Sequence, residues 1–506
     1  MCARVAARQS NSRQPDSRHR GGVDYRRTMA KRSVFISGGG PSGLAAALLF
    51  DQMGWDEIVV AERRAGPADF EKNKSFNYLI DKRGQRLLER LGILDQLPTV
   101  GVATREFVAT TITPDGMAKP QEVPIIDANR PTCYWTTRRA LLTMLFDAIE
   151  SRNSANMRVL YNHSVSGLER HQDGRLQVVL ENSAGEQEML TQDLVLACDG
   201  LNSVIRKGLS AQPDVPSNQF EMIVTPSLST GLQYKVLNLP ARFETIGGVG
   251  VDDPAMSYII PSRHRDPRKA CALFAFPVSD PTHPRSVNLI READHELWDV
   301  KTADALFEFL EDAFPQLAIR DLVSGEEAED FVSLDAGAFP APQYSASLLA
   351  SFGDGDARNH AVLIGDSAHA FPPDLGLGVN AALQDLDKLA EHFEQSDTIE
   401  QAVKAYAKER LPEARDLVWL VRTVFPQQYN HRPWRLKRWV ASFLLRKGLN
   451  AIAPGIFARP GFFLTQDPDM SFSEMRRAIA RTDRRIRALG LAVLSLAAGS
   501  AFIVLR

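Results

Sequence analysis

The sequence has few cysteines and almost no net charge. Its four cysteines, Cys2, Cys133, Cys198 and Cys271, are far apart and form no CxxC pair. This spacing argues against a disulfide framework, a zinc site and a redox dithiol, and favours a reducing compartment. The formal net charge is only −3, and no basic stripe interleaved with aromatic residues occurs along the 506 residues. We therefore expect no resident metal and no nucleic-acid partner.

The first 32 residues form a basic leader. They carry eight arginines and only two acidic residues, Asp16 and Asp24, and they lack the apolar run of a secretory signal. Three interpretations stay open: an organellar transit segment, a disordered extension, or a start site assigned upstream of Met29.

The last residues are apolar instead. Residues 488–505 contain no charged side chain, and eighteen apolar or small residues are just enough to cross a bilayer as a helix. Four arginines lie between residues 481 and 487, whereas only Arg506 follows. The positive-inside rule then keeps the preceding domains on the cytosolic side. The sequence predicts a C-terminal transmembrane helix, with a buried or interfacial helix as the alternative.

Residues 33–62 read as a strand, a glycine loop, a helix and a second strand. Gly38, Gly40 and Gly43 have the spacing at which the first glycine permits the turn, the second lets a pyrophosphate approach, and the third lets helix and strand pack. Helix N-terminal amides can receive the phosphate charge, and Glu62 can bind the ribose hydroxyls. The unit predicts a dinucleotide site, which also includes Pro41, Ser42 and Arg63.

Two later strands end in acidic turns. Asp199 and Gly200 end the apolar run of residues 193–200, and Gly365 and Asp366 follow the apolar start of residues 360–371. Together with the glycine loop, and in this order, the turns resemble signatures of the flavoprotein aromatic hydroxylases, a family of single-component FAD-dependent monooxygenases. The resemblance covers about residues 33–395 and implies that the cofactor is FAD. It places Asp199 near the pyrophosphate and Asp366 on a ribityl oxygen.

Arg138 is followed by Leu141 and Leu145, three and seven residues later, as in a helix of that family. The resemblance implies that this arginine contacts the FAD region. His369 belongs to the second acidic turn and has no evident carboxylate partner in the sequence, so we expect it to be structural.

The segment after the second turn is suited to the flavin ring. Pro373 stiffens the chain, and Gly376 and Gly378 allow the backbone to approach the ring closely. A helix that begins near Gly378 directs its N-terminal amides at the ring edge where reduced flavin is negative. We expect Val379 and Asn380, in the first turn of this helix, to lie beside the flavin.

The resemblance also implies an activity. Members of the family hydroxylate an aromatic substrate through a flavin C4a-hydroperoxide, using O₂ and NADPH as a transient co-substrate. The sequence has one nucleotide-binding fingerprint, which suits this use of NADPH. Two other classes stay open: an FAD-dependent reductase or epoxidase of a membrane isoprenoid, and a non-catalytic flavin-binding protein.

Four further segments resemble one branch of the family, the kynurenine 3-monooxygenases. Lys74–Leu79, Lys82–Gly84, Gly378–Ala381 and the segment 471–479 resemble that branch. The resemblance implies kynurenine 3-hydroxylation at the cytosolic face of the mitochondrial outer membrane or another intracellular membrane.

Substrate recognition departs from that branch. Its members bind the amino-acid group of the substrate with an arginine and a tyrosine, and Arg105 can supply the first. Residues 119–130 contain no tyrosine. Asn380 is the second expected substrate contact, and the substrate itself stays open.

The sequence thus predicts an α/β protein with a Rossmann-type FAD-binding domain and an interleaved substrate domain built on a mixed β-sheet. A helical C-terminal region precedes the membrane helix. The expected boundaries are 33–215 and 346–395 for the FAD-binding domain, 216–345 for the substrate domain, and 396–485 for the helical region.

Overall fold

The computed structural model describes residues 31–504, except residues 68, 70–76, 107, 123–125, 128, 356–357, 427 and 430–432. In the last helix, side chains are described only as far as residue 495, Val493 excepted. The basic leader therefore lies almost wholly outside the described residues. So do Lys74, Ser75 and Phe76 of the segment that resembles the kynurenine 3-monooxygenase branch.

The predicted strand–loop–helix–strand unit is confirmed. It consists of β1 (Ser33–Ser37), α1 (Pro41–Gln52) and β2 (Glu57–Glu62). The two strands pair in parallel, and most of their side chains are buried. Pro41 occupies the first helical position, where its missing N–H costs no hydrogen bond.

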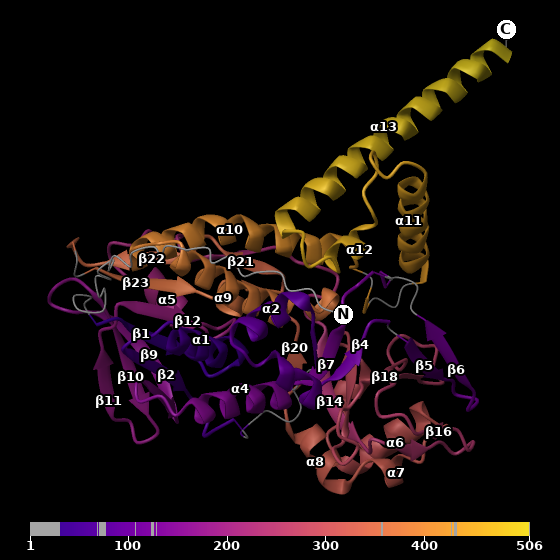
Figure 1. The fold of residues 1–506 in the computed structure, drawn as a ribbon. Helices are drawn as coiled ribbons and strands as arrows, with labels where there is room; N and C mark the ends of the chain where they lie inside the picture. Colours follow the sequence, from indigo (N-terminus) through magenta and orange to yellow (C-terminus); the bar gives the residue numbers. More distant parts are fainter. Residues whose placement is uncertain are drawn as a thin grey trace, which may run out of the picture.

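The unit lies in a six-stranded sheet that is parallel except at one edge (Figure 1). The carboxyl ends of neighbouring parallel strands meet at the same edge of a sheet, where ligands of doubly wound folds bind. In the central strands, Ser37 pairs with Ala197 and Ala197 with Leu363. This register brings the glycine loop and both acidic turns together. The strand order is β22 (Leu349–Phe352), β23 (Asn359–Leu363), β12 (Leu194–Ala197), β1, β2 and β8 (Met157–Tyr161).

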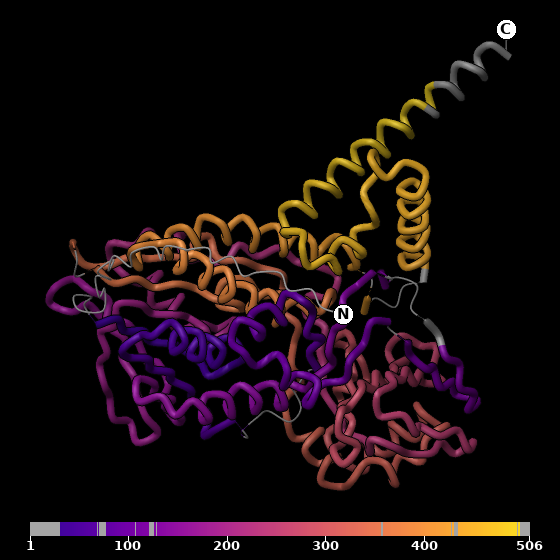
Figure 2. The backbone as a smooth tube through the Cα atoms, in the orientation of Figure 1, coloured from indigo at the N-terminus to yellow at the C-terminus, as the bar shows by residue number. Residues whose placement is uncertain are grey.

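Helices far apart in the sequence pack together beside this sheet. The first helix, α1, packs against both α4 (Arg138–Arg152) and α9 (Gly378–Glu394), so the indigo, purple and orange segments lie side by side in Figure 2. Two predicted helices, near residues 135–150 and 378–395, are thereby confirmed. The three-stranded antiparallel sheet of β9 (His163–Arg170), β10 (Leu176–Asn182) and β11 (Gln187–Leu190) adds to the same core.

A second core forms around a seven-stranded, mostly antiparallel sheet with a cluster of buried apolar residues of its own. Two strands come from residues 108–122, a segment that the sequence boundaries assign to the other domain. Helices α6 (Ala303–Ala313) and α8 (Gly325–Ser333) supply apolar residues to this cluster. The strand order is β20 (Gly337–Ala338), β14 (Gln233–Leu239), β19 (Arg285–Arg291), β18 (Ala272–Ala275), β17 (Ser257–Pro261), β5 (Val108–Ile112) and β6 (Ala118–Glu122).

Two small sheets complete the fold beside the large ones. One consists of β3 (Asn77–Ile80), β7 (Cys133–Thr137) and β4 (Val102–Thr104). The other consists of β13 (Met222–Val224), β21 (Gln343–Ser345) and β24 (His369–Ala370). The second sheet connects the acidic turn at Asp366 with the substrate domain.

The C-terminal region is helical, as predicted. It contains α10 (Ile399–Thr423), α11 (Pro433–Ile452), α12 (Gly461–Thr465) and α13 (Phe472–Val504). Figure 1 shows α13 leaving the body of the protein, with α11 beside it.

The predicted transmembrane helix is not found. Among the described residues, no helix is long and apolar enough to cross a membrane. Helix α13 is long, but its first part carries four arginines between residues 481 and 487.

Candidate active site

The glycine loop follows β1. At two positions of the loop the neighbouring backbone lies too close to admit any side chain larger than that of glycine. Gly38 has a φ of +98°, and a Cβ there would lie 2.6 Å from the Cys198 carbonyl oxygen. A Cβ on Gly43 would lie 1.8 Å from the Gly38 oxygen, because α1 crosses the loop closely. Gly40 differs, since a Cβ there would meet no atom within 4 Å. The backbone at Gly40 thus borders open space, as a site for a pyrophosphate requires.

Replacing Gly43 by alanine is expected to destabilise the fold by roughly 1–3 kcal/mol or more, because backbone must move to admit the methyl group. Urea unfolding of the purified chain measures this cost. Gly167→Ala in β9 is the matched control, since its Cβ would meet nothing within 4 Å. An unchanged unfolding midpoint for Gly43→Ala would contradict the close crossing.

Glu62 lies directly behind the loop. Its Oε2 accepts a hydrogen bond from the Gly39 amide at 2.7 Å, and its Oε1 accepts one from the Arg64 amide at 3.0 Å. The side chain is 7% exposed, so the carboxylate is held in a fixed position. Arg63, by contrast, is exposed. The ribose-binding role of Glu62 stays a prediction, and its position suits it.

Asp199 follows β12 and caps the short helix α5 (Val204–Ser210). Its Oδ2 accepts hydrogen bonds from the Val204 amide at 2.8 Å and the Ile205 amide at 3.2 Å. Its Oδ1 is buried and has no hydrogen-bond partner among the described residues. Burial raises the pKa of this carboxyl group. A Cβ on Gly200, at a φ of +77°, would meet nothing within 4 Å.

Asp366 is exposed, although Gly365 and Ser367 on either side of it are buried. Desolvation nevertheless raises the pKa of Asp366, against the opposing effects of His369 and Arg138. The Asp366 side chain is thus reached by solvent and is also surrounded by protein, so it lies in a recess of the surface. The glycine loop borders the same turn, because a Cβ on Gly365 would lie 3.3 Å from the Ser42 hydroxyl oxygen. We call the space beside Gly40, Asp199 and Asp366 the recess.

Arg138 is brought to the recess, as predicted for its region. It is the first residue of α4, which Thr137 caps by accepting a hydrogen bond from the Ala140 amide. Its guanidinium group lies near Tyr78 of β3 and near Asp366. Burial raises the pKa of Tyr78, which the sequence analysis did not single out.

The expected flavin end has the predicted local geometry. Gly376 is left-handed, with a φ of +63°, and follows a single 3₁₀ turn that Pro373 begins. A Cβ on Gly376 or on Gly378 would meet nothing within 4 Å. Helix α9 begins at Gly378 without a side-chain cap, so its first amides are not satisfied by a capping side chain. Val379 is half-buried in this turn.

Asn380 lies in the same turn, but its side-chain amide is hydrogen-bonded to backbone groups. Its Oδ1 accepts from the Asp81 amide at 2.9 Å, and its Nδ2 donates to the Leu79 oxygen at 2.7 Å and to the Gly376 oxygen at 3.2 Å. The side chain is 1% exposed. Asn380 thus fixes the start of α9 to the connection between β3 and α2 (Lys82–Arg90), and a substrate contact stays a prediction.

Arg105, the other expected substrate contact, is exposed just after β4. β4 shares its sheet with β3, which contains Tyr78, and with β7, which Arg138 follows directly. Thr104 pairs with Cys133 at the start of β7, whereas Tyr78 pairs with Thr136 near its end, so Arg105 lies toward the opposite end of this sheet from Tyr78 and Arg138. Of the stretch without a tyrosine, residues 123–125 and 128 lie outside the described residues.

A buried ionic network supports the second acidic turn. Asp385 of α9 accepts hydrogen bonds at Oδ2 from the Gly365 amide at 2.9 Å and from His369 Nε2 at 2.8 Å. Its Oδ1 accepts two from Arg410 of α10, at 2.9 and 2.7 Å. The expectation that His369 lacks a carboxylate partner is therefore wrong, because α9 returns Asp385 to the turn sixteen residues later.

Burial alone raises the pKa of Asp385, but the charges of His369 and Arg410 more than offset it and lower the pKa to about 2. The carboxylate is therefore ionised at neutral pH and holds both the turn and α10. Nothing in the local sequence indicates that Asp385, His369 and Arg410 are paired. Only knowledge of which faces of α9 and α10 pack together could have suggested the network.

A second buried carboxyl group was also missed. Asp374 lies between Pro373 and Gly376, is 1% exposed, and accepts a hydrogen bond from the Ser229 hydroxyl at 2.5 Å. Burial raises its pKa to about 6. This contact joins the expected flavin loop to the substrate domain.

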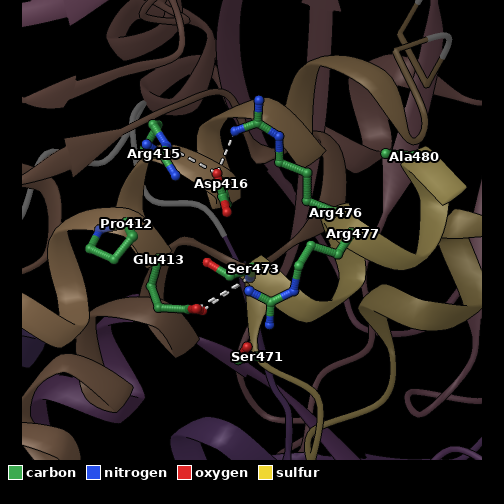
Figure 3. A pocket seen from close by; sticks show the side chains of 9 residues that line it. All are labelled: Pro412, Glu413, Arg415, Asp416, Ser471, Ser473, Arg476, Arg477 and Ala480. Atoms are coloured by element: carbon green, nitrogen blue, oxygen red, sulfur yellow. Dashed lines mark hydrogen bonds and ion pairs between the residues drawn. The ribbon is translucent and has the colours of Figure 1, made fainter.

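A cavity of about 640 Å³ lies elsewhere, between α10 and α13 (Figure 3). Its charged side chains bind the protein itself: Glu413 accepts from the Phe472 and Ser473 amides, and Asp416 accepts from Arg415 and Arg476. These contacts join the two helices, so the cavity is a helix junction and not a reaction site.

The residues at the recess fit FAD. Open space adjoins the backbone at Gly40, Gly200, Gly376 and Gly378, where a cofactor must approach closely. The buried Oδ1 of Asp199 lacks a hydrogen-bond partner within the described chain, and the carboxyl group of Asp366 faces the recess. The unsatisfied helix amides at α1 and α9 suit a pyrophosphate and the pyrimidine edge of a flavin.

Comparison with known proteins gives the same assignment. A family model described as FAD binding domain matches residues 31–285 and 356–420, more than half of the chain. The matched ranges include the glycine loop, Asp199, Asp366 and the start of α9.

Curated relatives and solved structures are similar over most of their length. Kynurenine 3-monooxygenase of Stenotrophomonas maltophilia is 27% identical over 400 residues, 76% of this chain and 77% of the relative. The enzyme of that name from Caenorhabditis elegans is 25% identical over 500 residues, 92% of this chain and 97% of the relative. The crystal structure of PqsL, a probable FAD-dependent monooxygenase from Pseudomonas aeruginosa, superposes with a TM-score of 0.53 at 18% identity, covering 81% of this chain and 99% of that one.

Proposed function

The chain belongs to the FAD binding domain family and is an FAD-dependent monooxygenase; from that premise we propose that it uses NADPH and O₂ to hydroxylate an aromatic amino acid of the kynurenine type. The observation that supports an FAD reaction most directly is the recess. There, a Cβ on Gly365 would lie 3.3 Å from the Ser42 hydroxyl oxygen and 2.8 Å from the Ala382 Cβ of α9, so the second acidic turn lies between the glycine loop and the helix that begins at Gly378.

When bound, FAD would supply the redox chemistry, accepting a hydride from NADPH and transferring one oxygen atom of O₂ to the substrate. The residues of this chain would bind and orient it. The loop at Gly40 and the first amides of α1 would receive the pyrophosphate, Glu62 the adenosine ribose, and Asp366 the ribityl chain.

At the other end, the amides that begin α9 would face the ring edge, where the helix dipole stabilises negative charge. Asn380 keeps this helix start fixed to the β3–α2 connection through its three backbone hydrogen bonds. Arg138 and Tyr78 would close the recess beside Asp366.

Two observations support the substrate class. The curated relatives named above are kynurenine 3-monooxygenases and match most of the chain at 25–27% identity. Arg105 is also exposed, just after β4, so its guanidinium group could bind the carboxylate of an amino acid. Because the expected tyrosine is missing, a related aromatic amino acid is an alternative substrate to kynurenine.

NADPH oxidation by the FAD-loaded full chain tests the function. Kynurenine is expected to accelerate the oxidation and to yield a hydroxylated product. Arg105→Ala is expected to raise the KM for kynurenine by roughly 10- to 100-fold, because a hydrogen bond to a charged group is lost. The exposed Arg242→Ala in the substrate domain should leave KM unchanged.

Oxidation of NADPH that responds to an isoprenoid and not to any aromatic amino acid would sink the substrate assignment. An Arg105→Ala chain with the original KM would remove this arginine from the substrate site while leaving the reaction class intact.

A further inference from the structure

The two faces of the seven-stranded sheet differ in what covers them. Successive side chains of its interior strand β19 point to opposite faces. Val287 and Leu289 belong to the apolar cluster that α6 and α8 complete, so Asn288, between them, points to the other face. Phe274 of β18 pairs with Asn288, and Ile259 of β17 pairs with Phe274, so all three lie on that face. We call it the open face, because Phe274 and Ile259 are only half-buried on it.

One side of the open face meets the small sheet that leads to the recess. Phe276, two residues after Phe274 along the chain, has its ring centroid 5.1 Å from that of Trp135. Trp135 lies in β7, and Arg138 at the recess follows this strand directly.

Another side of the open face meets the expected flavin loop. Ile290, two residues after Asn288, packs in one apolar cluster with Phe339 and Tyr429. The rings of Phe339 and Tyr429 lie 5.5 Å apart, centroid to centroid. Burial raises the pKa of Tyr429, and the charge of Asp374, in the loop between Pro373 and Gly376, raises it further. The open face is therefore bounded by two segments of the proposed FAD site.

Asn288 is a buried polar residue in apolar surroundings. Its side chain is 3% exposed, and the residues that pair with it are Phe274 and Val236. No described residue donates a hydrogen bond to its buried Oδ1. An unsatisfied acceptor in a protein interior destabilises the fold, whereas an apolar side chain at the same position would not. A ligand that donates to this oxygen would satisfy it.

We propose that the open face holds the aromatic ring of the substrate and that Asn288 accepts a hydrogen bond from an amino or hydroxyl group on this ring. The proposal rests on the proposed function and narrows its substrate class. Ile259 and Phe274 supply apolar contacts for the ring, and Asn288 supplies the polar contact that orients it. A site built to bind a substituent by a hydrogen bond discriminates against the analogue that lacks it. Kynurenine carries an amino group on its ring and is a ligand of this kind.

Two ligands and one variant test the proposal. The FAD-loaded full chain is titrated with kynurenine and with the analogue that lacks the ring amino group, and the flavin absorbance reports the two dissociation constants. Asn288→Leu keeps the approximate size of the side chain and removes the acceptor. The affinity of this variant for kynurenine is expected to fall by about three- to tenfold, as for the loss of one neutral hydrogen bond. Its affinity for the analogue is expected to stay the same.

Asn156→Leu is the matched control, because the same substitution is made at an exposed residue just before β8. It should leave both dissociation constants unchanged. The urea midpoint of Asn288→Leu without ligand should be equal to that of the unaltered chain or higher, since an unsatisfied polar group is removed.

An equal loss of affinity for both ligands, or a lowered urea midpoint, would show that Asn288 has a structural role and would overturn the proposal. So would an unchanged affinity of Asn288→Leu for kynurenine. If the unaltered chain binds kynurenine and its analogue equally well, this inference alone fails. If the unaltered chain binds neither compound, the proposed function fails with it.

Discussion

A Gly40→Val protein is expected to fold normally and to lose its FAD. Gly40 has a φ of −76° and a ψ of −175°, an extended conformation that valine adopts without strain. Its Cβ would meet no protein atom within 4 Å, so the substitution creates no clash in the apoprotein. The added isopropyl group instead fills the space where the pyrophosphate has to approach.

The expected loss of FAD affinity is at least about 100-fold, because hydrogen bonds to a charged group are each worth about 1.5–3 kcal/mol and several are lost together. Titration of the apoprotein with FAD measures it, and the urea midpoint checks the fold. Gly325→Val at the start of α8 is the control, since its Cβ also borders open space, but in the substrate domain. Full FAD affinity in Gly40→Val would place the pyrophosphate elsewhere.

Replacing Arg410 by methionine is expected to destabilise the protein by about 3–5 kcal/mol. Arg410 is 3% exposed and donates two hydrogen bonds to Asp385, so its removal leaves a buried carboxylate without one of its two counter-ions. Arg415→Met is the control on the same helix. Its guanidinium group is half exposed and pairs with Asp416 at 3.1 Å, a contact worth at most about 1 kcal/mol.

The contribution of the Asp385–Arg410 pair to the free energy of unfolding should also change with pH, and in one direction only. The folded pKa of Asp385 is about 2, below the roughly 3.9 of an unfolded aspartate. The unfolded state therefore binds more protons between these values, and stability rises with pH there. The contribution is complete above about pH 5 and is lost as the pH falls toward 2. A constant difference between the unaltered chain and Arg410→Met over this window would show that Asp385 is not responsible.

The residues that we propose bind FAD could be selected from the sequence because their chemistry is local. Gly38, Gly40 and Gly43 act within six residues, and the acidic turns at Asp199 and Asp366 end apolar strands that the sequence displays. Parallel pairing of β1, β12 and β23 then brings them to one edge. The α/β fold and a dinucleotide site followed from this pattern, whereas FAD as the cofactor followed from the resemblance to the flavoprotein hydroxylases.

The supporting contacts could not be predicted because they join distant segments. His369 meets Asp385 and Arg410 only when α9 and α10 pack on the turn, and Asp374 meets Ser229 from another domain. Two strands of the substrate sheet also come from residues 108–122, where the sequence has no mark of a domain boundary. The membrane helix was predicted from hydropathy at the chain end, but no described helix is long and apolar enough to cross a membrane.

The central claim is that one FAD occupies a site whose two ends are separated by about 330 residues of sequence. Hydrogen exchange of the full chain, measured with and without FAD, tests it most directly. The claim predicts that FAD slows exchange of the amides of residues 38–43 and of residues 376–380 together, at the same FAD concentration. Protection of only one of these segments, or of neither, would contradict it.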